Sequence, residues 1–136
     1  MGTFYGTAGS DNLIGTADSD YLAAYGGGFT QEIDILTGGL GADTFAIGDS
    51  SGMAYQGGVV PNHNLDYSYA LITDFSWQEG DKIQAYGDAG LYKLEYGSWS
   101  GTAAQDTGVY YNNDLIAVMQ DKSGPDVSIG LDFNFV

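Results

Sequence analysis

A nine-residue repeat constrains the fold of this chain more than any other feature of its sequence. Residues 6–14, 15–23 and 38–46 each begin with Gly and carry Asp at the sixth position and a large apolar residue at the eighth. Counting back nine residues from the last of these segments predicts a fourth unit that ends at Thr37, with an insertion before it around residues 24–29. The sixth positions are Asp11, Asp20, Asp34 and Asp43, and the eighth positions are Leu13, Leu22, Leu36 and Phe45.

This period predicts a coil of short parallel strands. The residues rich in Gly and Asp form a turn, and the three residues around the apolar side chain form a strand. Two units then complete one coil of a parallel β-roll, with the apolar eighth residues stacked inside. Glycine lets each turn curl and present its backbone carbonyls on the same side as the Asp carboxylate. The N-terminal third of the chain is therefore predicted to be a β-solenoid.

Composition leaves two roles open for these aspartates. Of the 18 acidic residues 15 are Asp, the chain has 22 Gly, and its net charge is −15. Asp and Gly are turn residues, so the aspartates could be no more than turn formers of a metal-free solenoid. Carboxylate oxygens and inward-facing carbonyls are also the ligands that calcium prefers. Stacked like charges repel at short range, which favours the second role.

The repeat resembles the RTX (hemolysin-type) calcium-binding nonapeptide, Gly-Gly-x-Gly-x-Asp-x-U-x, in which U is a large apolar residue. Residues 38–46 match it at every defined position, whereas the first two units carry Thr in place of the second Gly. Asp18 replaces the fourth-position Gly in the second unit, and Glu32 holds the equivalent place in the third.

The resemblance implies that calcium lies between turns on the same edge of the roll, and therefore between alternate units. Asp11 would then share an ion with Asp34, and Asp20 with Asp43, which gives at most two such sites. The ligands that the resemblance implies within the repeats are oxygens of Gly6, Ala8, Asp11, Gly15, Ala17, Asp18, Asp20, Glu32, Asp34, Gly38, Leu40 and Asp43.

A second likeness covers residues 70–83. This segment resembles the one that closes the roll in secreted RTX proteins, serralysin-type C-terminal domains included, and Asp74 and Asp81 fall at its two Asp positions. Two roles are open for Asp74, a ligand of the last calcium or a strand-end residue that caps a turn.

The remaining segments predict a loop and a cap. Residues 47–69 lack the period and predict a long loop, either a binding loop or an insertion, with a weak strand at Val59–Val60. Residues 70–136 predict a β-sandwich-like cap that resembles the cap of cyanobacterial members of the same family. No segment predicts a helix. The predicted strands cover residues 70–75, 82–86, 91–96, 108–112 and 115–119, the last two joined as a hairpin, and a final strand covers 131–136.

Several function classes are disfavoured. With no Arg and a charge of −15, the chain has no basic patch to meet nucleic-acid phosphates. No apolar run approaches the ~20 residues that span a bilayer, and the N-terminus lacks a Sec-type signal peptide. There is no cysteine, and His63 is the only histidine, so we predict that the chain is not an enzyme.

These patterns predict one all-β domain over residues 1–136: a short parallel β-roll of four nonapeptide units at 6–46, a loop at 47–69 and a β cap. The predicted function is a calcium-dependent folding and secretion module of a protein that is secreted or at the cell surface. Residues 131–136 resemble the uncleaved signal of type I secretion substrates. The alternative is an extracellular glycan-binding or self-associating adhesive module in which calcium is structural. Its candidate aromatic residues are Trp77, Tyr92, Tyr96, Trp99, Tyr110 and Tyr111.

Overall fold

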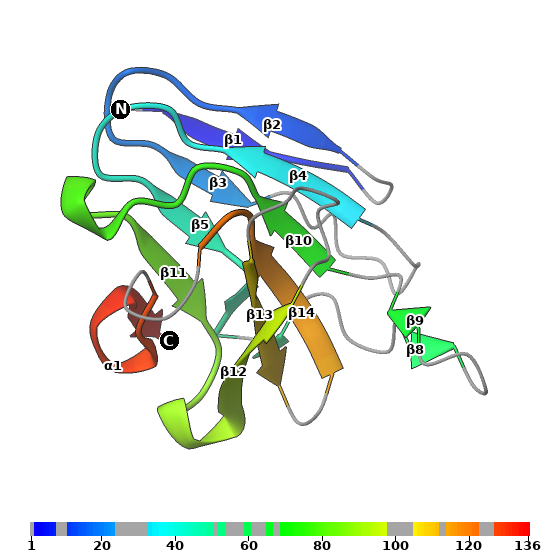
Figure 1. Cartoon of the computed structure of the whole chain (residues 1–136). Helices are drawn as coiled ribbons and strands as arrows, with labels where there is room; N and C mark the ends of the chain where they lie inside the picture. The colour runs from blue at the N-terminus through cyan, green and yellow to red at the C-terminus, as the bar shows by residue number, and fades with distance from the viewer. Residues whose placement is uncertain are drawn as a thin grey trace.

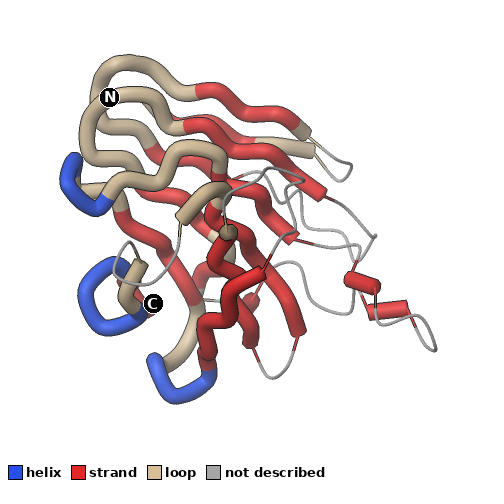
Figure 2. Tube along the Cα trace, viewed as in Figure 1, coloured by secondary structure: helices blue, strands red, loops and turns tan. Residues whose placement is uncertain are grey.

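The computed structural model confirms an all-β architecture, shown in Figures 1 and 2. Two sheets of five and six strands lie face to face and enclose the core between them. The structure describes residues 2–7, 11–23, 33–50, 52–53, 59–60, 65–66, 69–97, 105–111, 114–122 and 127–136.

The five-stranded sheet is entirely parallel, and the six-stranded sheet is parallel at one end and antiparallel at the other. In spatial order, the strands of the first sheet are β1 (Thr3–Tyr5), β3 (Tyr21–Ala23), β5 (Thr44–Ala46), β11 (Lys82–Ala85) and β15 (Phe133–Phe135). Those of the second sheet are β12 (Tyr92–Gly97), β13 (Asp106–Tyr111), β14 (Asp114–Met119), β10 (Tyr69–Ile72), β4 (Ile33–Thr37) and β2 (Asn12–Ile14).

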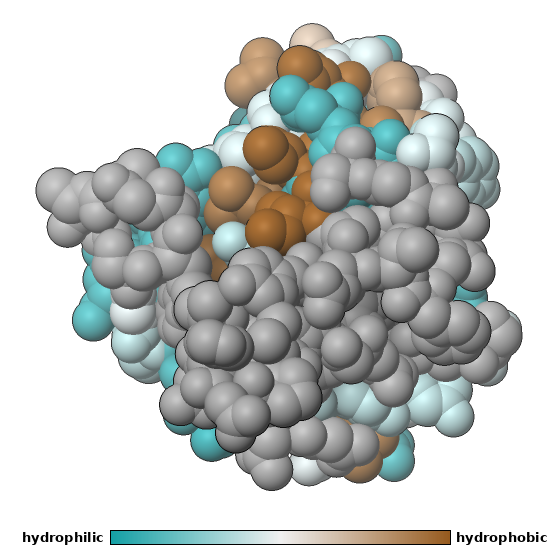
Figure 3. Space-filling view, turned by 90° about the vertical axis from the view of Figure 1, so that its right-hand side faces the viewer, coloured by the Kyte–Doolittle hydropathy of each residue, from teal (hydrophilic) through white to brown (hydrophobic). Residues whose placement is uncertain are grey.

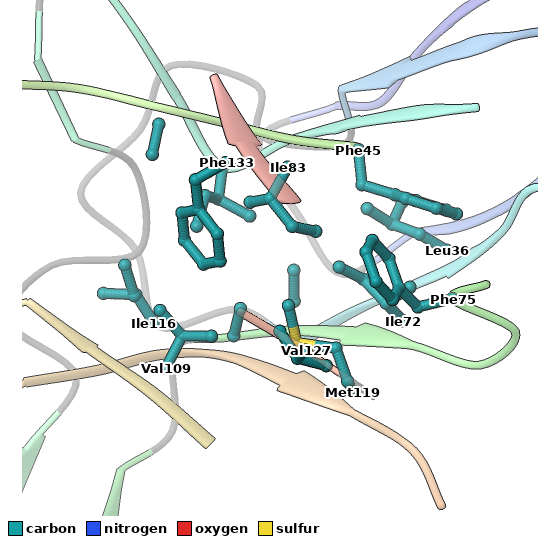
Figure 4. Close-up of a cluster of buried hydrophobic side chains, with 14 of the residues drawn as sticks. Leu36, Phe45, Ile72, Phe75, Ile83, Val109, Ile116, Met119, Val127 and Phe133 are labelled. Atoms are coloured by element: carbon teal, nitrogen blue, oxygen red, sulfur yellow. The ribbon is translucent and has the colours of Figure 1, made fainter. Parts of the chain in front are cut away.

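Strands formed by successive repeats alternate between the two sheets, as the nine-residue period predicts. In the five-stranded sheet Leu22 pairs with Phe45, and in the six-stranded sheet Leu13 pairs with Leu36. The eighth positions of alternate units therefore stack on one another and point inward. Three of the four side chains are fully buried, and Leu13 packs against the cluster from the edge. Figure 4 shows how side chains from both sheets meet in this core.

The C-terminal half, where the sequence predicted a β-sandwich-like cap, extends the same two sheets. β10 and β11 take the next places after β4 and β5, so Ile72 stacks on Leu36 and Ile83 on Phe45. β14 adds to β10 in parallel, and β13 and β12 continue that sheet as an antiparallel meander. The predicted hairpin between residues 108–112 and 115–119 is confirmed.

Other differences are local. Strand β1 was not predicted, although Phe4 lies one period before Leu13 and stacks on Leu22. A short helix, α1 (Ile129–Asp132), takes the beginning of the predicted terminal strand, and two 3-10 turns cover Trp77–Glu79 and Ala89–Leu91. Within the segment predicted as a loop, β6 (Gly48–Asp49) pairs with β7 (Gly52–Met53), and β8 (Val59–Val60) pairs with β9 (Leu65–Asp66).

Candidate metal centre

The turns that precede β3, β5 and β11 stack along one edge of the molecule, because those three strands are neighbours in one sheet. Figure 2 shows these turns at the edge where the five-stranded sheet begins, in tan except for the blue 3-10 turn at Trp77–Glu79. They comprise residues 15–20, 38–43 and 74–81, and each ends in an aspartate that is almost completely buried: Asp20, Asp43 and Asp81.

Each of these carboxylates accepts a hydrogen bond from a backbone N–H of the preceding coil. Asp43 Oδ1 accepts a hydrogen bond of 2.8 Å from the Asp20 backbone N–H, and Asp81 Oδ1 accepts one of 2.9 Å from the Asp43 N–H. On the opposite edge, Asp34 Oδ1 accepts a bond of 2.7 Å from the Asp11 N–H. The two aspartate pairs predicted from the repeat, Asp11 with Asp34 and Asp20 with Asp43, are therefore adjacent in space.

The second oxygen of the carboxylate distinguishes the units that carry Thr at their second position. Asp20 Oδ2 accepts hydrogen bonds from the Thr16 N–H at 2.6 Å and from Thr16 Oγ1 at 2.9 Å. Asp11 Oδ2 accepts from the Thr7 N–H at 2.6 Å in the same way. In these two turns the threonine therefore supplies hydrogen bonds to the aspartate of its own unit, and no other ligand is needed for that oxygen.

Asp43 accepts no such hydrogen bonds from its own turn, because the N–H groups of that turn donate to another residue. The second residue of its unit is Gly39, which has no hydroxyl, and the Gly39 N–H donates to Asp74 Oδ2 at 2.8 Å. The neighbouring Gly38 N–H donates to Asp74 Oδ1 at 2.9 Å. Asp43 Oδ2 is consequently buried with no hydrogen-bond partner, the only such side-chain atom among the described residues. Asp74 occupies the turn-capping place that was one of its two predicted roles.

Glycine is required where the turns approach each other. Gly39 has a φ of 93°, and a Cβ placed on it would overlap the Thr16 carbonyl oxygen of the turn below. A Cβ on Gly15 would overlap the Gly38 carbonyl oxygen and lie 2.8 Å from Asp20 Oδ2. Carbonyl and carboxylate oxygens of two successive turns therefore converge within a few ångströms of Gly15.

We expect Gly39→Ala to lower the free energy of unfolding by about 2 kcal/mol, because it combines left-handed backbone strain with a clash against backbone atoms. Gly90→Ala is the matched control, since a Cβ there meets nothing within 4 Å. Urea denaturation of both variants measures the difference. Equal stability of the two variants would mean that the turns are not held in this close contact.

The electrostatics single out the same carboxylate. Burial raises the pKa of Asp43 to about 6, and the charges of Asp81, Asp20 and Asp74 add to that increase. Burial also raises the pKa of Asp81. The hydrogen bond from the Thr16 N–H lowers the pKa of Asp20. A buried carboxylate with a raised pKa and one oxygen without a partner is stabilised as an anion by a nearby cation.

The other predicted ligands fall in different surroundings. Asp34 and Gly38 are buried, Gly6 and Gly15 are half-buried, and Ala17, Asp18 and Leu40 are exposed along the turns. Ala8 and Glu32 lie outside the described residues. Over the part of the chain that the structure describes, no three Asp, Glu or His side chains group closely enough to hold a metal ion. Any ion here would need backbone carbonyls as well.

Asp81 belongs to this stack but was not among the predicted ligands. The signal for it is present in the sequence, because Asp81 and Ile83 repeat the spacing of the sixth and eighth positions, as Asp43 and Phe45 do. The shifted glycine pattern of residues 74–81 conceals this likeness.

The predicted aromatic residues that the structure describes lie on several different elements. Tyr92 is buried against Tyr111 and Phe133, whereas Trp77 and Tyr96 are exposed on different elements. Trp99 and His63 lie outside the described residues.

Residues 48–52 form a Gly-x-Ser-x-Gly pattern, which can mark a nucleophile elbow. It occupies the hairpin of β6 and β7, not a strand-to-helix turn. The described residues of this pattern therefore do not form the strand-to-helix turn of a nucleophile elbow.

No protein-family model matches the chain, and no curated protein is similar enough to count as a match. None of the helices in the described segments is long and apolar enough to cross a membrane.

Proposed function

We propose that this chain is a calcium-binding module of the RTX type, which folds fully only when calcium is bound. The observation that carries the proposal is Asp43 Oδ2, a buried carboxylate oxygen without a partner in the one unit that matches the RTX nonapeptide at every defined position. Burying an unpaired anion is costly unless a cation compensates it.

Asp43 would supply a carboxylate oxygen to the ion, and the turn carbonyls of Thr16 and Gly38 would supply neutral ones. Bound calcium would contribute positive charge at the point where two stacked turns meet. An all-oxygen donor set without His or Cys selects calcium over zinc. Magnesium is disfavoured because it demands a smaller, octahedral shell.

The hydrogen bonds divide the repeats into two kinds. Units with Thr at the second position satisfy their own aspartates, so we infer that they add coils without needing an ion. The unit that begins Gly38-Gly39 lacks those hydrogen bonds to its own aspartate, so the Asp43 Oδ2 oxygen is left available to bind calcium. We therefore favour one principal site at Asp43 on this edge, within the two that the repeat allows.

Calcium-dependent folding suits an exported protein, and this extends the proposal to a secreted or cell-surface module. A chain of charge −15 would remain unfolded at low calcium and would fold outside the cell, where calcium is abundant. Residues 131–136 would then act as the export signal of type I secretion while the chain is unfolded.

The test is calcium titration of Asp43→Asn by isothermal calorimetry. We expect an affinity weaker by roughly tenfold or more, because ligand charge sets calcium affinity. Asp88→Asn is the control, since Asp88 is exposed and makes no capping hydrogen bond. Zinc binding in the absence of a calcium response, or equal calcium affinity in the two variants, would contradict the proposal.

A further inference from the structure

The two sheets end differently at the two ends of the molecule. At one end the edge strands are β1 and β2, and at the other they are β15 and β12 (Figure 1). An edge strand exposes unpaired backbone N–H and C=O groups that can pair with another chain. How each end is protected therefore decides where this protein can associate.

The end formed by β12 and β15 carries features that oppose pairing. Lys93 and Glu95 of β12 form an exposed ion pair of 3.1 Å, and charged side chains discourage a further strand. Next to β15, Lys82 Nζ donates a hydrogen bond of 2.7 Å to the Leu131 carbonyl of α1. This helix lies directly before the edge strand.

Among the described residues, the end formed by β1 and β2 carries no such charged protection. None of the six residues of these strands is charged, in a chain that carries 18 acidic side chains. Tyr5 is 71% exposed and Ile14 is 63% exposed. Phe4 and Leu13 are only half-buried, although they belong to the layers that form the core. Figure 3 shows apolar residues in brown at this upper end of the molecule.

Solenoid ends of this kind need a polar cap if the protein is to stay monomeric, and this one has an apolar end instead. We propose that β1 and β2 form the interface of a symmetric homodimer, in which two copies of this chain meet end to end. Each sheet would continue across a two-fold axis, with β1 antiparallel to its copy and β2 antiparallel to its copy.

The strand pattern fixes the register of this dimer. Each strand has three residues, and only the central one, Phe4 or Leu13, points inward. Antiparallel pairing centred on these residues keeps both inside, where each meets the same residue of the second copy. Thr3 then lies opposite Tyr5 of the second copy on the outer face. A two-fold axis perpendicular to the sheets satisfies both strands at once and leaves no open end to grow further.

The area available predicts a weak dimer. Four apolar side chains and two short edges amount to roughly 500–600 Å² per copy, given 150–250 Å² for one buried aromatic residue. That is below the ~800 Å² per partner of a standard specific interface. The charge of −15 on each copy also opposes association. The inference does not depend on a particular calcium site, but the protein must be folded, so it is tested in excess calcium.

Sedimentation velocity of the full chain over about 1–200 μM tests the proposal, a range chosen for a small interface. We expect a concentration-dependent shift from monomer to dimer and no larger species. Ile14→Lys should weaken the dimer at least tenfold, because it places a charge on the edge. Leu131→Lys is the matched control, since Leu131 is 76% exposed at the other end and the charge change is the same.

A wild-type chain that stays monomeric at every concentration would overturn the proposal. So would equal weakening by both variants, or growth into larger species, which would indicate head-to-tail contacts. Circular dichroism of each variant confirms that it is folded.

The register has its own test, because the chain contains no native cysteine. A mixture of Thr3→Cys and Tyr5→Cys proteins should form the mixed disulfide under mild oxidation, since these residues face each other across the axis. Disulfides formed equally well within each variant alone would overturn the proposed register.

Discussion

In a calcium chelator at neutral pH, we expect the backbone amides of β3 and β5 to exchange with solvent about a hundredfold faster than in excess calcium. Ligand binding to the folded state alone adds RT ln(1 + [L]/Kd), which is ~2.7 kcal/mol at a hundredfold excess over Kd. Exchange that requires opening of these strands slows by the corresponding factor. Hydrogen exchange followed by mass spectrometry measures it by segment.

The physical reason lies between the stacked turns. Asp20, Asp43 and Asp81 follow one another up the edge, and Asp74 approaches the same turn. Two of the three lysines are engaged elsewhere, Lys82 with the Leu131 carbonyl and Lys93 with Glu95. Without a cation, like charges at short range cost up to a few kcal/mol, which is a large part of a domain's net stability.

Strands β13 and β14 are the internal reference for this experiment. They lie on the far side of β10 from the repeats, and Val109 and Ala117 are buried in the core. We expect their amides to respond less to calcium than those of β3 and β5. Equally slow exchange of β3 and β5 in chelator and in calcium would show that the repeats fold without metal.

The N-terminal strands could be predicted from the sequence because one period sets both their positions and their partners. With Asp at the sixth position and an apolar residue at the eighth, the strand location follows directly. Alternation of units then makes Leu22 the neighbour of Phe45. The same reasoning extends to Phe4, one period before Leu13, and it would have predicted β1.

The C-terminal half could not be predicted in this way. The nine-residue repeat is interrupted between Phe45 and its next neighbour, Ile83, and between Leu36 and Ile72, so the period alone does not show that these strands continue the two sheets. The parallel pairing of β14 with β10 joins residues far apart in the sequence. Isolated strand patterns do not specify such long-range partners.

The candidate site shows the same division. That Asp20 and Asp43 would be adjacent followed from the spacing of the repeat. The absence of a partner for Asp43 Oδ2 did not follow from that spacing. It depends on Asp74, which lies 35 residues after Gly39 and whose carboxylate accepts hydrogen bonds from the Gly38 and Gly39 N–H groups. Spacing predicts which groups are close, whereas hydrogen-bond competition decides which one is left without a partner.

The second large effect concerns pH. In the absence of metal, we expect the protein to become more stable as the pH falls from 7 to about 4.5, by about 2 kcal/mol from Asp43. The folded-state pKa of Asp43 is about 6, against an ordinary value of 3.8. The folded state therefore binds a proton more tightly than the unfolded state, and acidification through this window favours folding. Urea denaturation at a series of pH values in chelator measures the trend.

The other shifted groups do not change the sign within this window. The pKa of Asp81 is also raised by burial, so it contributes in the same direction. The pKa of Asp20 is lowered, so its contribution to stability is present above 3.8 and is lost only as the pH falls further. Stability should therefore pass through a maximum and decline once the pH falls below the ordinary Asp range.

Calcium should reverse this trend. When the ion is bound, Asp43 must be ionised, so protons compete with calcium and acidification weakens binding. The calcium-loaded protein should lose stability between pH 7 and 4.5, while the metal-free protein gains it. Asp43→Asn removes the titrating group and should flatten both curves, whereas Asp88→Asn should leave both slopes in place. Parallel pH profiles with and without calcium would mean that the ion does not bind at Asp43, and a metal-free protein that loses stability from pH 7 to 4.5 would mean that this carboxylate is already compensated within the fold.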